Sequence, residues 1–380
     1  MESPSRQGIV LIVIVLCFFS VSCRDSSINE GLLNSLETLK MEYAPDGRTS
    51  VFKYELVNDT LKGQIDDVQL HQKVKSLLVG LDLVEAMQLL PSQDLADTLA
   101  YINVSVGNIR SKAAESSELS TQALLGTPLR VLEKSGSWFR VQTPDAYIGF
   151  IENSAIAFDD SFDSQANKVV YKGAYGFSYQ NPLLSGLKVS DLTFGNILRK
   201  LETGSKSTKV QYPDERIAYI SNADLQSVED FVNKAKHNGI IASSQEFLGI
   251  PYLWGGTSMK GVDCSGFTRT SFMMNGIYLP RDASQQALVG DAIDTSSGFE
   301  KLKEGDLLFF GRQTDKGNKV THVAIYLGEL KFIHSSGMVR YGSFDPESAY
   351  YDSYNLTRFL FAKRIIESNS IRYLNPQNFY

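Results

Sequence analysis

The stretch Pro251-Tyr252-Leu253-Trp254-Gly255-Gly256, followed closely by Asp263-Cys264-Ser265-Gly266, decides the fold of this chain. The glycines allow the backbone to turn sharply, and Phe267, Phe272 and Met274 follow at the spacing of a helix. We therefore expect Cys264 to lie in the first turn of that helix. A thiol there is exposed to the positive end of the helix dipole, which favours the thiolate.

Bulk composition indicates a folded, multidomain protein. The chain has 380 residues, of which 43% are hydrophobic and 21% are charged, and this length favours two to four domains. The formal net charge is −6. Without a basic run, that charge argues against nucleic acid as a partner.

The N-terminal residues predict a secretory signal over residues 1–23. Arg6 precedes a short apolar run that ends in Ser20-Val21-Ser22-Cys23, and the run is too short to span a bilayer. The small residues before Cys23 resemble a bacterial lipobox, although Ser20 stands where leucine is usual. We expect lipidation at Cys23, with membrane contact through the lipid only, in the bacterial cell envelope as a periplasmic or outer-membrane lipoprotein. A plain signal peptide cut nearby is the alternative.

Cysteine usage then leaves Cys264 as the one thiol of the mature chain, because Cys17 leaves with the signal and Cys23 takes the lipid. No intramolecular disulfide is possible on this interpretation. A single thiol in an oxidising compartment indicates a functional one.

Four further regions follow from the pattern of strands, helices and turns. Residues 24–95 predict a small α+β unit in which no chemistry is visible. Residues 96–158 contain short strands and turns that resemble a bacterial SH3-like barrel, with Phe150 where the family usually has tryptophan. Residues 159–226 have similar spacing and predict a second, divergent SH3-like domain. Residues 227–375 read as helices followed by an antiparallel sheet, which is an α+β domain.

Two histidines complete a nucleophilic site in the last region. His322 and His334 lie on successive predicted strands, so a hairpin places their rings on one face, where His334 orients His322. An adjacent imidazole is also expected to lower the pKa of the Cys264 thiol. A small buried cysteine and a zinc site are the alternatives, but CxxC and HExxH spacings are absent. His71 and His237 are expected to face solvent.

These motifs resemble the NlpC-type cell-wall cysteine peptidases, a papain-like family that cleaves peptidoglycan stem peptides. The resemblance implies Cys264 as nucleophile, His322 as base, His334 as third polar residue, and Tyr252 near the oxyanion. It is carried by Tyr252-Leu253-Trp254-Gly255-Gly256, Asp263-Cys264-Ser265-Gly266-Phe267, Leu279-Pro280-Arg281 with Ser284-Gln285, Gly305 to Phe310, His322 to Gly328 and Ile333-His334-Ser335.

The order of domains resembles the γ-D-glutamyl-L-diamino acid endopeptidases, which act on muropeptides with a free N-terminal L-alanine. That resemblance implies substrate binding by Asp263, the residue before the nucleophile, with Ser265 and Ser284 beside it. It also implies that the first SH3-like domain contributes to the pocket, where Glu118 and Tyr147 are the candidates. A buried substrate ammonium needs such a carboxylate.

Two alternatives stay open. Within the peptidases, the chain could be a DL-endopeptidase on intact peptidoglycan; in another class, it could be a catalytically inactive wall-binding module with SH3-like ligand readers. Acyltransferases and lipid hydrolases share the fold, but they usually reverse the order of the cysteine and histidine motifs. We expect no metal and no organic cofactor.

Overall fold

The computed structural model describes residues 22–159, 162, 167–233, 239–366 and 368–373, and the predicted signal up to residue 21 lies outside them. The side chain of Cys23 is likewise outside the described part. The chain divides into two units, residues 1–47 with 51–89, and residues 48–50 with 90–380. Within the described ranges, none of the helices combines the length and apolarity needed to cross a membrane.

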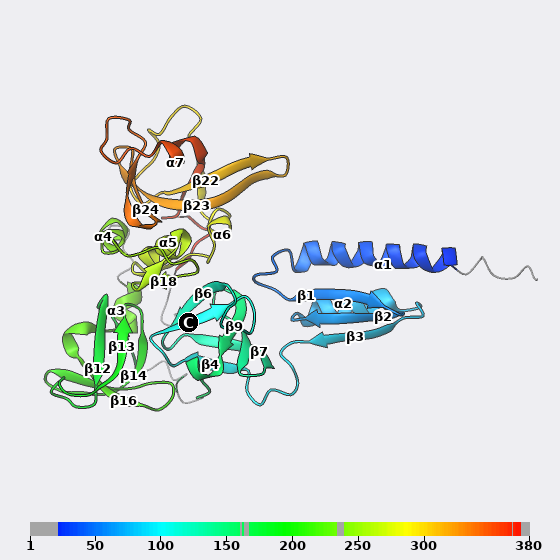
Figure 1. The fold of residues 1–380 in the computed structure, drawn as a ribbon, viewed down its shortest axis with the longest axis horizontal. Helices are drawn as coiled ribbons and strands as arrows, with labels where there is room; N and C mark the ends of the chain where they lie inside the picture. Colours follow the sequence, from blue (N-terminus) through cyan, green and yellow to red (C-terminus); the bar gives the residue numbers. More distant parts are fainter. Residues whose placement is uncertain (1–21, 160–161, 163–166, 234–238, 367, 374–380) are drawn as a thin grey trace, which may run out of the picture. The chain divides into compact units, whose positions relative to one another are not determined.

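The first unit is the predicted small α+β domain (Figure 1). Helices α1 (Ser22–Tyr43) and α2 (Val68–Leu78) accompany a sheet in which β1 (Phe52–Val57) and β2 (Thr60–Ile65) are antiparallel and β2 and β3 (Val84–Leu89) are parallel. The β1–β2 turn has Asn58 and Asp59 at positive φ, where these residue types are tolerated. The apolar face of α2 is buried against the sheet in one core.

The prediction that His71 faces solvent is wrong. His71 is buried, and its Nε2 lies 3.1 Å from Glu85 Oε1 on β3. The charged neighbours of His71 in sequence concealed that it shares the inner face of α2 with Leu70 and Val74. His237 lies outside the described residues.

Two seven-stranded sheets follow in the second unit. The first β domain contains β4 (Leu99–Ile102), β5 (Val106–Arg110), β6 (Leu119–Leu124), β7 (Pro128–Ser135), β8 (Trp138–Gln142), β9 (Ile148–Glu152) and β10 (Ile156–Ala157). The second β domain contains β11 (Lys168–Tyr171), β12 (Tyr175–Tyr179), β13 (Lys188–Thr193), β14 (Ile197–Thr203), β15 (Ser207–Gln211), β16 (Ile217–Ser221) and β17 (Leu225–Ser227).

The two β domains repeat one topology. Their strand orders are β10-β4-β7-β8-β9-β5-β6 and, read from the other edge, β17-β11-β14-β15-β16-β12-β13. Each strand of the first sheet, β4 to β10, therefore corresponds in position to the strand of the second sheet whose number is seven higher, β11 to β17. The second β domain has the strand order of the first, in agreement with the similar spacing of residues 159–226.

The last domain is the α+β domain that the motifs predict. It begins with α3 (Val228–Asn233), α4 (Ile240–Gln245), the short pair β18 (Thr257–Ser258) and β19 (Gly261–Val262), α5 (Cys264–Met273), β20 (Ile277–Tyr278) and α6 (Ala283–Gln286). An antiparallel sheet in the order β21-β26-β22-β23-β24-β25 follows. Its strands are β21 (Asp291–Ile293), β22 (Leu307–Thr314), β23 (Gly317–Gly328), β24 (Lys331–Ser336), β25 (Met338–Ser343) and β26 (Phe359–Arg364), with α7 (Ser353–Arg358) before β26 and β27 (Arg372–Tyr373) paired with β20.

Helix α5 packs on β23 and β24 through one aromatic and aliphatic core. Phe267 and Phe272 of α5 are fully buried there with Phe309, Val323 and Ile333 of the sheet. Burial of a side chain of this size contributes about 1.5–3 kcal/mol. The start of α5 is thereby fixed against β23, the strand that carries His322.

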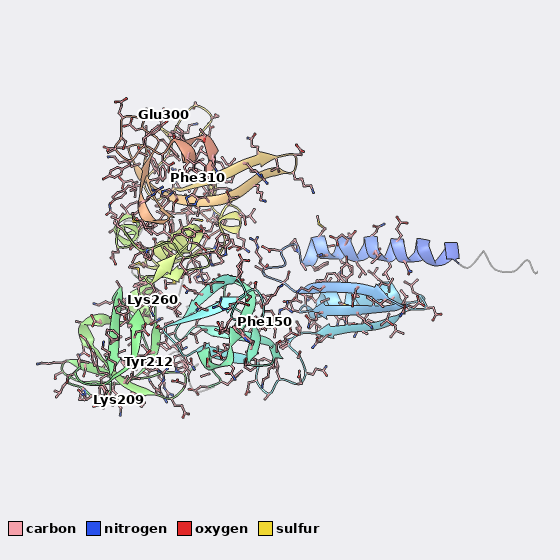
Figure 2. The ribbon with its side chains drawn as sticks, in the orientation of Figure 1. Phe150, Lys209, Tyr212, Lys260, Glu300 and Phe310 are labelled. Carbon is pink, nitrogen blue, oxygen red and sulfur yellow. The ribbon has the colours of Figure 1, made fainter. Side chains whose placement is uncertain are left out.

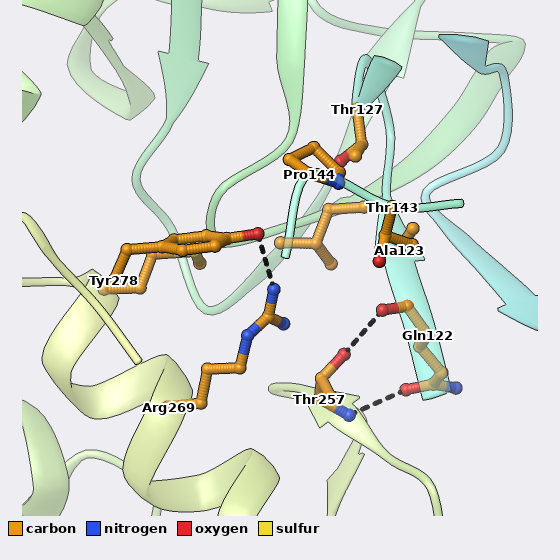
Figure 3. A pocket seen from close by; sticks show the side chains of 10 residues that line it. Gln122, Ala123, Thr127, Thr143, Pro144, Thr257, Arg269 and Tyr278 are labelled. Atoms are coloured by element: carbon orange, nitrogen blue, oxygen red, sulfur yellow. Dashed lines mark hydrogen bonds between the residues drawn. The ribbon is translucent and has the colours of Figure 1, made fainter. Parts of the chain in front are cut away.

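The first β domain is hydrogen-bonded to the α+β domain through Thr257 of β18. The Thr257 N–H donates to Gln122 Oε1 at 3.0 Å, and its hydroxyl donates to the Gln122 carbonyl at 3.0 Å (Figure 3). Beside this contact, Arg269 of α5 donates to the Tyr278 hydroxyl at 2.8 Å and pairs with the buried Asp145 at 3.2 Å. These contacts join β6 to β18, and the β8–β9 loop to the helix that begins at Cys264.

Lys260 lies at the β18–β19 turn (Figure 2), and its side chain contacts both β domains. Its Nζ donates to Ser105 Oγ at 2.7 Å and forms an ion pair with Asp191 of β13. The Ser105 hydroxyl also donates to Asp191 at 3.0 Å. One side chain therefore links all three domains of the second unit.

Candidate active site

The first turn of α5 is built around the carboxylate of Asp263. Asp263 is the N-cap of the helix, and its Oδ1 accepts from the Gly266 N–H at 2.7 Å, while its Oδ2 accepts from the Gly255 N–H at 3.0 Å. Gly266 is required here because a Cβ would lie 2.0 Å from the carbonyl oxygen of Gly256. The glycine-rich turn thus fixes Cys264 as the first residue of the helix, as the sequence predicts.

Cys264 is buried at this turn, and only 8% of the residue is exposed. Burial, and then the negative charge of Asp263, raise the pKa of its thiol to about 12. Backbone N–H groups of Val323 and Ser265 and the charge of Arg281 oppose the shift. The expected lowering of this pKa is therefore wrong for the resting protein, because desolvation of the sulfur outweighs the favourable dipole.

His322 and His334 are in contact, as the hairpin predicts. His322 Nε2 lies 2.9 Å from His334 Nδ1, and the ring planes are at 76°. The pairing of β22 with β23 shifts register between Phe310 and Gly311, which leaves Thr321 as an extra residue directly before His322. Such bulges reorient neighbouring side chains and are frequent beside active sites.

Both imidazoles are neutral near pH 7. Burial, followed by the proximity of His334, lowers the pKa of His322 to about 3. Burial lowers the pKa of His334 to about 4 against the opposing charge of Asp352. In the absence of substrate, the site therefore holds a neutral thiol and two neutral imidazoles.

Behind the thiol lies a buried ion pair that sequence reasoning missed. Arg281 has an exposed fraction of 1%, and its Nη2 and Nη1 donate to Asp263 Oδ2 at 2.6 Å and Oδ1 at 3.2 Å. The same guanidinium donates to Ser265 Oγ at 3.1 Å and to Thr121 Oγ1 of β6 at 2.8 Å. Arg281 therefore compensates the charge of Asp263 and joins the first β domain to the site.

A cleft of about 390 Å³ opens over Cys264. It brings together the sulfur and the residues that the sequence singled out around it, from both the α+β domain and the first β domain. Those residues are Tyr252, Asp263, Ser265, Ser284, Tyr147 and Glu118. Arg48, Ser120, Trp254, Asp282, Ala283, Val320 and Thr321 complete the lining, whereas His322 and His334 are not part of it.

Two tyrosines in the cleft keep their protons. Burial and the nearby Cys264 and Asp263 raise the pKa of Tyr252, and burial with the charge of Asp282 raises the pKa of Tyr147. The Tyr147 hydroxyl donates to Asp282 Oδ2 at 3.2 Å. Tyr252 is therefore a hydrogen-bond donor over the whole working pH range.

Known proteins resemble the chain in the α+β domain and in the first β domain. Residues 249–361 match the NlpC/P60 family, and residues 109–156 match the bacterial dipeptidyl-peptidase Sh3 domain. A gamma-D-glutamyl-L-lysine dipeptidyl-peptidase of Bacillus cereus is 34% identical over 231 residues, which cover 57% of this chain and 67% of that protein. The chain belongs to the NlpC/P60 family.

A second relative and a solved structure match a similar or larger share of the chain. The gamma-D-glutamyl-L-lysine dipeptidyl-peptidase of Bacillus subtilis is 32% identical over 226 residues, covering 57% of this chain and 72% of the relative. The crystal structure of an NlpC/P60 family protein from Bacillus cereus superposes with a TM-score of 0.61 at 25% identity. That alignment covers 70% of this chain and 99% of the other, so the predicted papain-like fold with an SH3-type domain is confirmed.

Proposed function

We propose that this protein is a cysteine endopeptidase that hydrolyses the γ-D-glutamyl–diamino acid bond of peptidoglycan stem peptides. The preferred substrates are free muropeptides with an N-terminal L-alanine, in wall turnover or recycling. One observation carries the proposal: Cys264 shares a single cleft with Glu118 and Tyr147 of the first β domain. The names of the relatives support the same bond.

The chemistry follows from the neutral resting site. His322 accepts the thiol proton while the sulfur attacks the amide carbonyl, and the protonated imidazole then protonates the leaving amine. The Tyr252 hydroxyl and backbone N–H groups at the start of α5 stabilise the oxyanion. Water hydrolyses the resulting thioester, with His322 again as base.

Recognition of the substrate ammonium falls mainly to Glu118. Within the described residues its carboxylate forms no ion pair or side-chain hydrogen bond, and it is exposed to the cleft. Asp263, by contrast, already pairs with Arg281 and accepts from two backbone N–H groups. Asp263 therefore shapes the pocket, while Glu118 supplies the uncompensated negative charge that an ammonium requires.

Lipid attachment at Cys23 is part of the proposal. The apolar run and the small residues before Cys23 support export and anchoring in the bacterial cell envelope. Expression of the full chain with labelled fatty acid tests this. Label and membrane association that Cys23→Ala abolishes would support the anchor, and an unlabelled, released protein would reject it.

The activity is tested by mass spectrometry with L-Ala-γ-D-Glu-meso-diaminopimelate. The N-acetylated peptide, the lysine-containing peptide and intact sacculi serve as comparison substrates, and Cys264→Ala as the control enzyme. We expect release of L-Ala-D-Glu from the free peptides only, and none from the variant. Equal cleavage of the acetylated peptide and sacculi would favour an endopeptidase on intact wall, and no cleavage at all would favour a wall-binding module.

A further inference from the structure

Arg48 reaches the cleft from a part of the chain in which the sequence showed no chemistry. Residues 48–50 group with the second unit, apart from the residues on either side. The Arg48 carbonyl accepts from the Ile148 N–H at 2.7 Å, and the Thr49 carbonyl accepts from Gln142 Nε2 at 2.9 Å. The backbone at Arg48 is thus held by β8 and β9 of the first β domain.

The side chain of Arg48 ends at the start of α6. Its Nη1 donates to Asp282 Oδ2 at 2.7 Å and to Ser284 Oγ at 3.1 Å. Asp282 Oδ2 is also the oxygen that accepts from the Tyr147 hydroxyl. Arg48 therefore lies beside two residues, Ser284 and Tyr147, that the sequence assigned to substrate binding.

The arginines and aspartates around the cleft form ion pairs with one another. Arg281 pairs with Asp263 and lies 3.8 Å from Asp282, and Arg48 pairs with Asp282. Two guanidinium groups thus compensate two carboxylates. The Arg281 side chain is 1% exposed, whereas that of Arg48 is 41% exposed. Among the described residues that line the cleft, Arg48 is the one cation.

The substrate class proposed above adds an anion to this cleft. A γ-linked glutamate is joined through its side-chain carboxyl group, so its α-carboxylate remains free and charged. An unpaired carboxylate would be strongly disfavoured near Glu118, whose charge no ion pair within the described residues compensates. A guanidinium is the group that best matches a carboxylate in charge and geometry.

We infer that Arg48 is a specificity-determining residue that binds the α-carboxylate of the γ-linked D-glutamate, with the Ser284 hydroxyl beside it. The inference rests on the proposed function and deepens it. It means that the enzyme distinguishes γ-D-glutamyl peptides from those whose α-carboxyl group is an amide.

The test compares kcat/KM for L-Ala-γ-D-Glu-meso-diaminopimelate and for the same peptide with an α-amide in place of the α-carboxylate. The enzymes are the wild type, Arg48→Met, which keeps the length of the side chain, and Arg48→Lys, which keeps the charge. Arg312→Ala removes an exposed arginine of β22 outside the cleft and is the matched control. Thermal unfolding of each variant checks the fold, and a half-exposed ion pair contributes little to it.

We expect the wild type to prefer the α-carboxylate peptide by about 10- to 100-fold, the range for hydrogen bonds to charged groups. In Arg48→Met, kcat/KM for the carboxylate peptide should fall by that factor, whereas kcat/KM for the amide peptide should change less than about threefold. Arg48→Lys should fall between, and Arg312→Ala should match the wild type.

Equal losses on both peptides would overturn the inference, because Arg48 would then only position Asp282 and Ser284. A wild-type enzyme that cleaves both peptides equally would overturn it as well, while leaving the proposed function intact. A wild type that cleaves neither peptide would reject the proposed function, and the inference with it.

Discussion

His322 Nε2 lies 2.9 Å from His334 Nδ1, and this contact constrains the protonation of both rings. If Nδ1 of His322 is to accept the thiol proton, its Nε2 must carry hydrogen and donate to His334. His334 Nδ1 is then the acceptor, so His334 Nε2 carries hydrogen as well. That Nε2 is buried and has no hydrogen-bond partner among the residues that the structure describes, and Asp352 Oδ2 lies 4.0 Å from it.

The first prediction concerns Asp352 as a positioning residue. Its carboxylate favours the His334 tautomer that the base requires, and it favours positive charge on the pair during proton transfer. We expect Asp352→Ser to lower kcat by about 10- to 100-fold with little change in KM. Serine keeps an oxygen at the N-cap of α7, where Asp352 accepts from the Asn355 N–H at 3.0 Å.

The measurement is steady-state kinetics with thermal unfolding of the same variant as the fold control. A wild-type kcat in Asp352→Ser would show that the carboxylate does not act on the histidines. A parallel loss of folding would be resolved with Asp352→Asn, which preserves both the cap and the side-chain volume.

The second prediction concerns the reactivity of Cys264 when no substrate is bound. Because burial raises the pKa of the thiol to about 12, its thiolate fraction is small at neutral pH. The rate of alkylation by iodoacetamide should therefore rise about tenfold per pH unit from pH 7 to pH 10 without a plateau. Subtraction of the rate measured on Cys264→Ser removes reaction at other thiols. A plateau near neutral pH would indicate a preformed thiolate–imidazolium pair instead.

How far the sequence predicts this site depends on how local each signal is. The sequence is enough to predict Cys264, His322 and His334, because a turn, a helix and a hairpin fix their positions through residues that are near in sequence. Glu118 and Tyr147 came from a family resemblance, since nothing in their own neighbourhood indicates a cleft. Arg48 carried no signal because its partner Asp282 is 234 residues away and both lie outside periodic segments.

The structure of the first unit shows the same limit. The helices and the β1–β2 hairpin of this α+β unit follow apolar periodicity. Strand β3 does not, because Val-Glu-Ala-Met-Gln-Leu has only one buried side chain, Met87, and the strand pairs in parallel with β2 after the intervening helix α2. The pKa of Cys264 was also beyond sequence reasoning, because the dipole is a local feature whereas desolvation depends on everything packed around the sulfur.

The third prediction is acid sensitivity of the catalytic sheet. The folded state keeps His322 and His334 neutral down to about pH 3 and pH 4, while unfolded histidine protonates near pH 6.5. Below pH 6.5 the unfolded chain binds more protons, so stability falls as the pH drops. Between pH 7 and pH 5 we expect a loss on the order of 2–4 kcal/mol for the pair.

Hydrogen exchange of the β23 amides at pH 7, 6 and 5, corrected for the intrinsic exchange rate, measures this loss in the α+β domain itself. The double variant His322→Gln, His334→Gln removes both titrating groups and should flatten the pH dependence. An unchanged slope in that variant would assign the acid sensitivity to other groups.

The fourth prediction concerns the buried pair of Arg281 and Asp263. Removal of one partner leaves the other charge buried without compensation, so Arg281→Met should destabilise the protein by about 3–5 kcal/mol. The loss includes the contact with Thr121, which joins β6 to the site. Asp263→Asn with Arg281→Met removes both charges, and asparagine still caps α5. The double variant should therefore be more stable than Arg281→Met alone.

Urea unfolding of the wild type, both single variants and the double variant closes the cycle for this pair. Lys301→Ala, which breaks an exposed pair with Asp294, is the matched surface control and should leave the midpoint unchanged. A double variant no more stable than Arg281→Met would contradict the argument, because the cost would then arise from lost packing and hydrogen bonds and not from an uncompensated Asp263. Recovery of stability without recovery of activity would show that the pair is needed to hold the Cys264 turn in its reactive geometry.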